Sequence, residues 1–177
     1  MFLSNKQDSG RSSNTKLLLV VAFSYFLIAF MHLAVTKRFD LPYLMGDRSV
    51  AVFDLWSLQH FCAGILLASI AIRIASLGLW REKLGMILLF EICWEALELS
   101  MESGYFGQTI AQWKGGFEHW SNRLIGDPLM VIIGALVAKK FSSAWKIIFI
   151  PATLWLLLNI SYSSSMHVQH ALFGQRD

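Results

Sequence analysis

Five long apolar segments constrain the fold of this chain more than any other feature of its sequence. A helix needs roughly 20 mostly apolar residues to cross a bilayer, because it rises about 1.5 Å per residue through about 30 Å of hydrocarbon. The fourth segment is short unless it continues through Phe141. The sequence therefore predicts an all-α protein, a bundle of about five transmembrane helices within residues 16–162. The segments are Lys16–Val35, Leu58–Trp80, Leu84–Met101, Pro128–Ala138 and Trp145–Ile160.

The composition agrees with a membrane environment and excludes several other classes of protein. Hydrophobic residues make up 55% of the chain and charged residues 15%, whereas about a quarter of a typical soluble domain is charged. Disorder would require low hydrophobicity, and a pair of cysteines cannot supply a disulfide framework. The formal net charge of +3 is small, so no nucleic-acid partner is expected. The lipid bilayer is the expected partner.

The ends of the chain and its short loops predict how it sits in the membrane. Residues 1–15 are polar and serine-rich, which predicts a disordered cytoplasmic tail, and residues 163–177 form a polar C-terminal tail. The run Lys16–Val35 is too long for a typical signal peptide, so we expect a retained helix. Basic residues in the first tail and in the loops 81–83 and 139–146 lie on one side of a five-helix path. This bias predicts a cytoplasmic N-terminus in the plasma membrane.

The strongest chemical signal is a set of four glutamates on the third predicted helix: Glu91, Glu95, Glu98 and Glu102. At about 100° per residue they fall within about 60° of one another. A carboxylate in mid-bilayer costs a few kcal/mol, so this stripe is expected to face a protein interior or a water-filled cavity. Arg73 lies at the depth of Glu91 in an antiparallel pair, so these two either form a structural ion pair or leave Glu91 in the site. No membrane-embedded cation remains for Glu95 or Glu98.

Further polar residues are expected at the outer end of the same helices. His60 opens the second predicted helix and falls level with Glu98 in an antiparallel pair. Asp127 precedes Pro128, a combination that predicts an N-cap followed by the first helical residue. His32 is expected at this end as a buried core histidine. The residues that we expect to converge near the outer leaflet are His60, Glu95, Glu98, His119, Asn122 and Asp127.

This convergence is compatible with two kinds of chemistry. In the first, His60, Glu95 and Glu98 hold a divalent metal, since mixed nitrogen and oxygen donors suit Zn, Mn or Fe. In the second, no metal binds, and an acid–base site forms in which burial separates the pKa values of two carboxyl groups. The spacing matches no zinc signature such as H-E-x-x-H. The residues assigned to catalysis are Glu95, His60, Asp127 and Glu91.

The run from Phe90 to Ser100 resembles a motif of a small bacterial membrane-protein family of the UPF/DUF type. In that family one helix reads Glu-x-x-Trp-Glu-x-x-Glu-Asn/Ser, after a helix that starts near a histidine. The layout is also distantly similar to the VanZ-like group, in which an aspartate and a His-Phe pair open one helix. The resemblance implies an integral protein of the bacterial inner membrane and implies no reaction. The matching residues are His60, Glu91, Trp94, Glu95, Glu98, Asn122, Asp127 and Gly134.

Three functions are compatible with these features. The leading hypothesis is an inner-membrane protein whose polar site near the outer leaflet acts, as a metal- or carboxylate-dependent enzyme, on a lipid or lipid-linked substrate. The alternative is an accessory subunit of a larger membrane complex, which the small size and the Trp and Phe content suit equally well. A proton-coupled carrier is less favoured, because many carriers are built from internal repeats and none is visible here.

Overall fold

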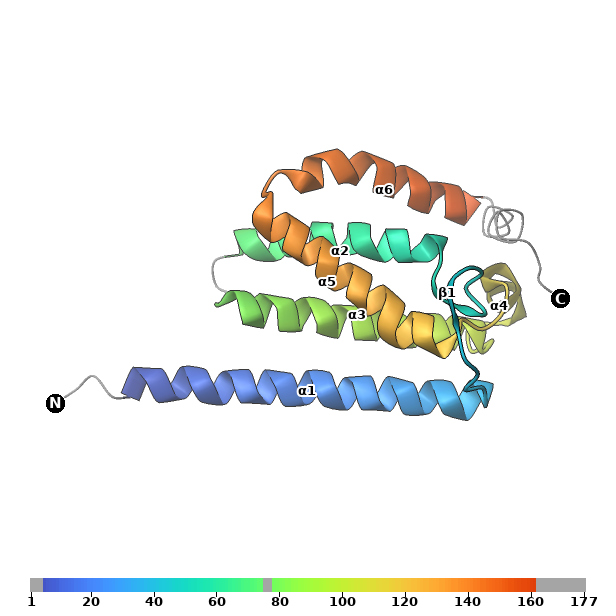
Figure 1. Cartoon of the computed structure of the whole chain (residues 1–177), viewed down its shortest axis with the longest axis horizontal. Coiled ribbons are helices and arrows are strands. Elements are labelled where there is room, and N and C mark those ends of the chain that lie inside the picture. Colours follow the sequence, from blue (N-terminus) through green and yellow to red (C-terminus); the bar gives the residue numbers. More distant parts are fainter. Residues whose placement is uncertain (1–4, 75–77, 162–177) are drawn as a thin grey trace.

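The computed structural model describes residues 5–74 and 78–161, and these are mostly helical. Long helices run back and forth beside one another, while α4 and β1 gather at one end of the bundle (Figure 1). The strands found among the described residues are a parallel pair of three residues each. The all-α class is therefore confirmed. The elements are α1 (Asn5–Thr36), β1 (Tyr43–Met45), β2 (Ala51–Phe53), α2 (Leu55–Arg73), α3 (Trp80–Glu102), α4 (Gln108–Lys114), η2 (Asn122–Gly126), α5 (Asp127–Lys140) and α6 (Ala144–Ser161).

The first helix extends further towards the N-terminus than its apolar run predicts. α1 begins at Asn5 rather than Lys16, so residues 5–15 are helical where a disordered tail is expected. Once an apolar run has formed a helix, each residue added to it gains a hydrogen bond, so the helix can propagate into a polar flank. The predicted polar tail 163–177 lies outside the described residues.

The boundary between the second and third helices also differs from the prediction. α2 begins at Leu55, because Asp54 and Ser57 form a capping box that satisfies backbone groups of its first turn. It ends at Arg73, and Trp80 belongs to α3 instead of α2. The first turn of α2 thus lies at the same end of the bundle as the last turns of α1 and α3 (Figure 1).

The segment Glu102–Gly126, between the third and fourth apolar segments, is partly helical. It contains α4 and then η2, a single π-helical turn that leads directly into α5. Asp127 has helical dihedrals (φ −68°, ψ −45°), so the prediction that it caps this helix is wrong. Its carboxylate instead accepts a hydrogen bond from Ser57 of α2. Such π turns within helices are rare and occur frequently at functional sites.

A close crossing of α2 and α5 forms the centre of the bundle. A Cβ atom on Gly64 would overlap the carbonyl of Val131, and one on Gly134 would overlap the carbonyl of Phe61. The two backbones therefore touch, an arrangement that small residues permit where membrane helices cross. This contact fixes the start of α2 against the start of α5. The buried core around it consists of Ile65, Ala68, Ala71, Ile87, Val131, Ala135 and Ala138.

Two helices of the described chain are long and apolar enough to cross a membrane. They are α1, within Thr15–Thr36, and α2 over its whole length. α6 contributes a shorter apolar stretch, Ala144–Trp155. Only 11% of the most apolar part of α1 is buried, because this helix packs mainly on α3. Most of its apolar surface therefore faces outwards.

Candidate functional site

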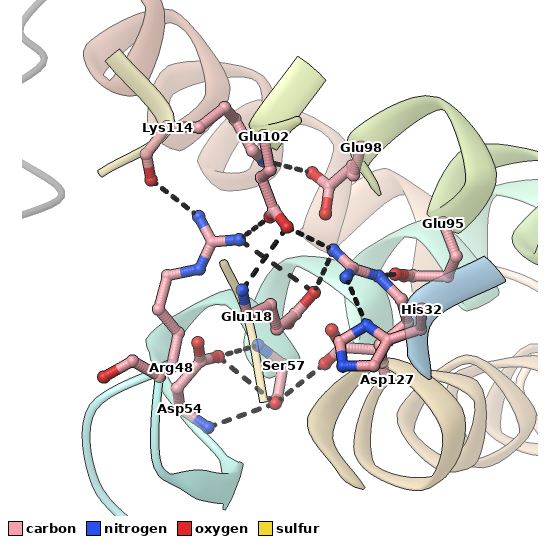
Figure 2. Close-up of polar contacts among 12 residues, drawn as sticks. His32, Arg48, Asp54, Ser57, Glu95, Glu98, Glu102, Lys114, Glu118 and Asp127 are labelled. Atoms are coloured by element: carbon pink, nitrogen blue, oxygen red, sulfur yellow. Dashed lines mark hydrogen bonds and ion pairs between the residues drawn. The ribbon is translucent and has the colours of Figure 1, made fainter. Parts of the chain in front are cut away.

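Buried polar side chains meet at the end of the bundle that carries α4 and β1 (Figures 1 and 2). α1 and α3 end there, and α2 and α5 begin there, so residues far apart in the sequence come together. Each member of this polar cluster is at most 9% exposed. The members are His32, Arg48, Asp54, Ser57, His60, Glu91, Glu95, Glu98, Glu102, Lys114, Glu118, His119, Asn122, Arg123 and Asp127.

Arg123 of η2 is fully buried and holds several of these groups together. Its Nε donates to Glu95 (3.2 Å), and its Nη2 donates to Glu102 (2.9 Å). Nη2 also lies 3.0 Å from Glu118, while Nη1 donates to Nδ1 of His32 (3.0 Å). Burial lowers the pKa of the guanidinium, but the carboxylates of Glu118, Glu102 and Glu95 outweigh that effect and raise it above its ordinary value. Arg123 therefore stays charged.

Two further cations neutralise the part of the polar cluster nearest α4. Arg48 pairs with Glu102, donates to the carbonyl oxygen of Lys114 (2.9 Å) and lies 4.0 Å from Glu118. The Lys114 ammonium donates to Glu98 at 2.6 Å. Figure 2 shows these side chains converging from α3, α4 and the loop before β2. Glu98, Glu102 and Glu118 thus each have a cationic partner.

Glu95 and Glu98 are nevertheless paired with cations, although the sequence predicts none for them within the membrane helices. Their partners, Arg123 and Lys114, come from the segment Glu102–Gly126, which lies outside the predicted membrane helices. This segment folds back over the end of the bundle and buries its charged side chains. In the sequence alone, Arg123 looks like an ordinary loop residue.

Five charged members of the polar cluster were not predicted: Arg48, Asp54, Lys114, Glu118 and Arg123. A charge count is the signal that points to the three cations among them. Four acids on a buried stripe require cations nearby, because an unpaired buried charge costs several kcal/mol. The loops at this end of the bundle are the segments able to supply those cations, although the sequence does not say which side chains turn inwards.

His60, near the start of α2, faces three carboxylates. Its Nδ1 lies 2.6 Å from Glu91 and 3.8 Å from Oε1 of Glu95. Its Nε2 lies 3.4 Å from Oδ2 of Asp127. Ser57, one turn earlier on α2, donates to the other oxygen of Asp127 (2.9 Å). The imidazole therefore sits between α3 and α5 with both ring nitrogens directed at acids. The structure thus brings together all four residues assigned to catalysis.

The predicted ion pair between Arg73 and Glu91 is not formed, because Glu91 pairs with His60. Arg73 donates to the carbonyl oxygen of Ser69 (2.6 Å), and its guanidinium lies 5.1 Å from the ring centroid of Trp145. Positive charge is favourable at the C-terminal end of a helix, and an aromatic face attracts it further. Arg73 thus has a local structural role, and Glu91 belongs to the polar cluster.

A cavity of about 200 Å³ lies between α2 and α3 beside His60. His60, Glu91 and Glu98 are its buried polar lining. Phe90 and Trp94, which also line it, are 56% and 38% exposed, so the cavity opens on the apolar outer surface of the bundle. The lining residues are Trp56, Gln59, His60, Ala63, Phe90, Glu91, Trp94 and Glu98.

His119 and Asn122 lie in the polar cluster but do not contact His60. Nδ1 of His119 lies 2.7 Å from the hydroxyl oxygen of Ser121, and its Nε2 lies 3.5 Å from Asp40. Burial lowers the pKa of His119, so its imidazole is neutral at pH 7. Its backbone N–H donates to the carbonyl of Arg48 (2.8 Å), which ties η2 to the loop before β2. Asn122 is fully buried, and among the described residues its side-chain amide has no hydrogen-bond partner.

The polar cluster holds more acids than cations. Its carboxyl groups are those of Asp54, Glu91, Glu95, Glu98, Glu102, Glu118 and Asp127, and its Lys and Arg residues are Arg48, Lys114 and Arg123. Burying uncompensated charge is costly, so protons or a bound cation must balance the excess. Burial and the carboxylate of Glu118 raise the pKa of Asp54 to about 6. Oε1 of Glu95 and Oδ2 of Asp127 have no hydrogen-bond partner among the described residues.

Three groups of donor atoms in the described polar cluster lie close enough together to hold a metal ion. The predicted set of His60, Glu95 and Glu98 is not among them. Glu91 takes the place of Glu98, whose carboxylate is held by Lys114. The three groups are His60–Glu91–Glu95, Glu95–Glu118–Asp127 and Glu98–Glu102–Glu118.

Comparison of the chain with protein-family models, with curated proteins and with solved structures finds no match. The resemblance of the Phe90–Ser100 run to a bacterial membrane-protein family therefore stays a prediction. What can be inferred about function rests on the geometry of the polar cluster and of the cavity beside it.

Proposed function

We propose that this chain is an integral protein of the bacterial inner membrane whose polar cluster acts on a lipid or lipid-linked substrate near the outer leaflet. The observation that carries the proposal is the cavity between α2 and α3. It leads from an exposed apolar rim at Phe90 and Trp94 to the buried pair His60 and Glu91. A substrate with an apolar portion can therefore reach buried ionisable groups from the side of the bundle.

The two faces of α3 support a lipid environment. Its glutamates at 91, 95, 98 and 102 are buried, whereas its exposed large side chains are apolar: Met86, Phe90, Trp94 and Leu97. In water the opposite distribution is expected. Ionisable residues within membrane helices face the bundle interior or a water-filled cavity and mark functional sites. We infer five spans, α1, α2, α3, α5 and α6, since these helices lie side by side and alternate in direction (Figure 1).

The basic residues of the short loops support an outer position for the polar cluster. Arg81 and Lys83 lie in the first turn of α3, and Lys139, Lys140 and Lys146 lie where α5 ends and α6 begins. All five are therefore at the end of the bundle opposite the polar cluster. Basic loops remain in the cytoplasm, so we place the N-terminus there and the polar cluster at the outer leaflet.

The contacts around His60 suit general acid–base chemistry. His60 and Glu91 line the cavity 2.6 Å apart, within the range for direct proton transfer. In the metal-free site we assign proton transfer to and from the substrate to this pair. Glu95 and Asp127 face the imidazole from the protein side. Hydrolysis or group transfer at a lipid headgroup is the reaction class that this arrangement supports, with or without a divalent metal such as Zn, Mn or Fe.

Lipid conversion in vesicles tests this proposal. The purified full-length protein is reconstituted with a bacterial polar lipid extract, and every lipid species is quantified by mass spectrometry over time. We expect at least one species to be consumed, with a rate lowered about 100-fold or more in Glu91→Gln and His60→Gln. Glu82→Gln makes the same chemical change at the opposite end of α3, where Glu82 caps the backbone of Leu79. It should retain full activity.

Lipid profiles that match protein-free vesicles would contradict an enzymatic role. Recovery of a stoichiometric protein partner after gentle detergent extraction, together with unchanged lipids, would favour the accessory-subunit alternative. The weakly buried α1 gives that alternative its physical basis, because its apolar surface is free to contact either lipid or another membrane protein.

A further inference from the structure

We propose that His60, Glu91 and Glu95 form a divalent-metal site whose open coordination position faces the cavity. The three donor atoms, a ring nitrogen of His60 and one carboxylate oxygen from each glutamate, lie within 4.8 Å of one another. One imidazole and two carboxylates form a mixed set that suits Zn²⁺ or Mn²⁺. This inference deepens the proposed function and rests on it for the identity of the substrate, but not for the binding of the metal.

The distances fit a small divalent ion. Metal–ligand bonds of about 2.0–2.2 Å in a tetrahedral site separate the ligand atoms by roughly 3.3 Å. The distances from Nδ1 of His60 to Glu91 and to Glu95, 2.6 Å and 3.8 Å, fall on either side of that value. Binding of the ion replaces the proton between His60 and Glu91 with the metal and releases that proton to water.

Two unpartnered buried oxygens face the imidazole of His60, one at the proposed metal position and one at the other ring nitrogen. Glu95 is 2% exposed; its Oε2 accepts from Arg123, while its Oε1 faces His60 without a hydrogen bond. Asp127 is fully buried; its Oδ1 accepts from Ser57, while its Oδ2 lies 3.4 Å from Nε2 of His60. A metal-bound histidine usually donates its other ring N–H to a carboxylate. Asp127 is placed to accept that hydrogen bond.

The other two donor groups do not serve as well. Both consist of carboxylates alone, and both include Glu118, which lies 3.0 Å from Arg123. In the third group, Lys114 holds Glu98 and two arginines hold Glu102. Protein cations thus already neutralise these oxygens. The group at His60 adjoins the cavity through His60 and Glu91, which leaves a coordination position for water or substrate, as catalytic zinc sites require.

Metal content of the intact protein tests the site without any lipid substrate. The full chain in detergent is treated with a chelator, loaded separately with Zn²⁺ and with Mn²⁺, and analysed by mass spectrometry. We expect about one ion per chain, lost in Glu91→Gln and Glu95→Gln and retained in Glu82→Gln. Asp127→Asn should weaken binding by roughly 10- to 100-fold while leaving the ligands in place. Size-exclusion profiles and unfolding midpoints establish that each variant is folded.

Absence of bound metal from the unmodified protein would overturn the inference, as would equal metal content in both glutamine variants. If a variant fails to fold, the Mn²⁺-loaded unmodified protein provides the test. Its electron spin-echo spectrum should show one histidine nitrogen bound to the metal. A spectrum without that nitrogen would also overturn the site. Lipid conversion that persists after complete metal removal overturns a role of the metal in the reaction and leaves the proposed function standing. Metal binding without lipid conversion would support the metal site and contradict the proposed enzymatic function.

Discussion

Two regions of the polar cluster differ in how their charges are balanced. The paired region comprises Arg48, Glu98, Glu102, Lys114, Glu118 and Arg123, where every carboxylate contacts a cation. The cavity region comprises His60, Glu91, Glu95 and Asp127, where acids surround a single imidazole. Glu95 joins the two regions, with one oxygen on Arg123 and the other facing His60.

This difference separates a region that stabilises the fold from a region that is available for chemistry. In a buried ion pair the two charges neutralise each other and both side chains are held in one position. The paired region therefore anchors the segment between α3 and α5. The cavity region leaves buried acid unbalanced, and such local violations are expected at functional sites, where the rest of the fold compensates for them. Substitutions in the two regions should therefore have opposite consequences for stability and for activity.

The largest effect is expected from Arg123→Met. Removing the guanidinium leaves Glu95, Glu102 and Glu118 without their shared cation, and breaking a buried pair in this way costs about 3–5 kcal/mol. The free energy of unfolding in detergent, followed by tryptophan fluorescence during denaturant titration, measures this loss. Arg81→Met, at an exposed position of α3, should change it by less than about 0.5 kcal/mol. A loss below about 1 kcal/mol in Arg123→Met would show that the paired region does not anchor the fold.

A pH dependence is expected from Asp54, which caps α2 beside both regions. Burial and the carboxylate of Glu118 raise its pKa from 3.8 to about 6, so the folded state binds this proton more tightly than the unfolded state. The free energy of unfolding should therefore fall by about 3 kcal/mol as the pH rises from about 4 to about 6. Asp54→Asn keeps the capping oxygen and should flatten this slope. An unchanged slope would assign the pH dependence to another group.

The same substitution in the two regions sharpens the comparison. Glu98→Gln weakens the contact with Lys114 and should cost about 2 kcal/mol of stability, since hydrogen bonds to charged groups contribute about 1.5–3 kcal/mol. Glu91→Gln removes one unbalanced charge next to His60 and should cost less than about 1 kcal/mol while abolishing lipid conversion. The free energy of unfolding and the rate of lipid conversion, both measured on each variant, test this difference. Equal stability losses in the two variants would remove the distinction between the regions.

The smallest effect is expected from Ser57→Ala. This change deletes the hydrogen bond from Ser57 to Asp127, worth about 1 kcal/mol, and the acceptor that Ser57 offers to the backbone N–H of Asp54 in the capping box, and it leaves every charge in place. Ser103→Ala is the matched control, because the Ser103 hydroxyl donates to the carbonyl of Ser100 at an exposed position. Thermal unfolding midpoints compare the two variants. Indistinguishable midpoints would mean that Asp127 does not depend on Ser57 for its position.

The sequence predicted the convergence of the cavity region better than that of the paired region. Helical periodicity placed Glu91 and Glu95 on one face, and antiparallel helices brought His60 and Asp127 to the same end. Each of these residues lies within a regular helix, where the rise per residue fixes its depth. The residues of the paired region come largely from irregular segments, whose path depends on contacts distant in the sequence.

The sequence by itself determined the five long helices apart from their boundaries, the common face of the four glutamates and the end of the bundle where the polar residues gather. These features follow from local periodicity and from the high cost of exposing carboxylates to an apolar medium. Only the tertiary structure decided that Glu91 pairs with His60 rather than Arg73, that Lys114 takes Glu98, and that Arg123 is fully buried. The rotation of each helix and the fold of the segment before α5 set those partners. Both result from packing, which no local pattern encodes.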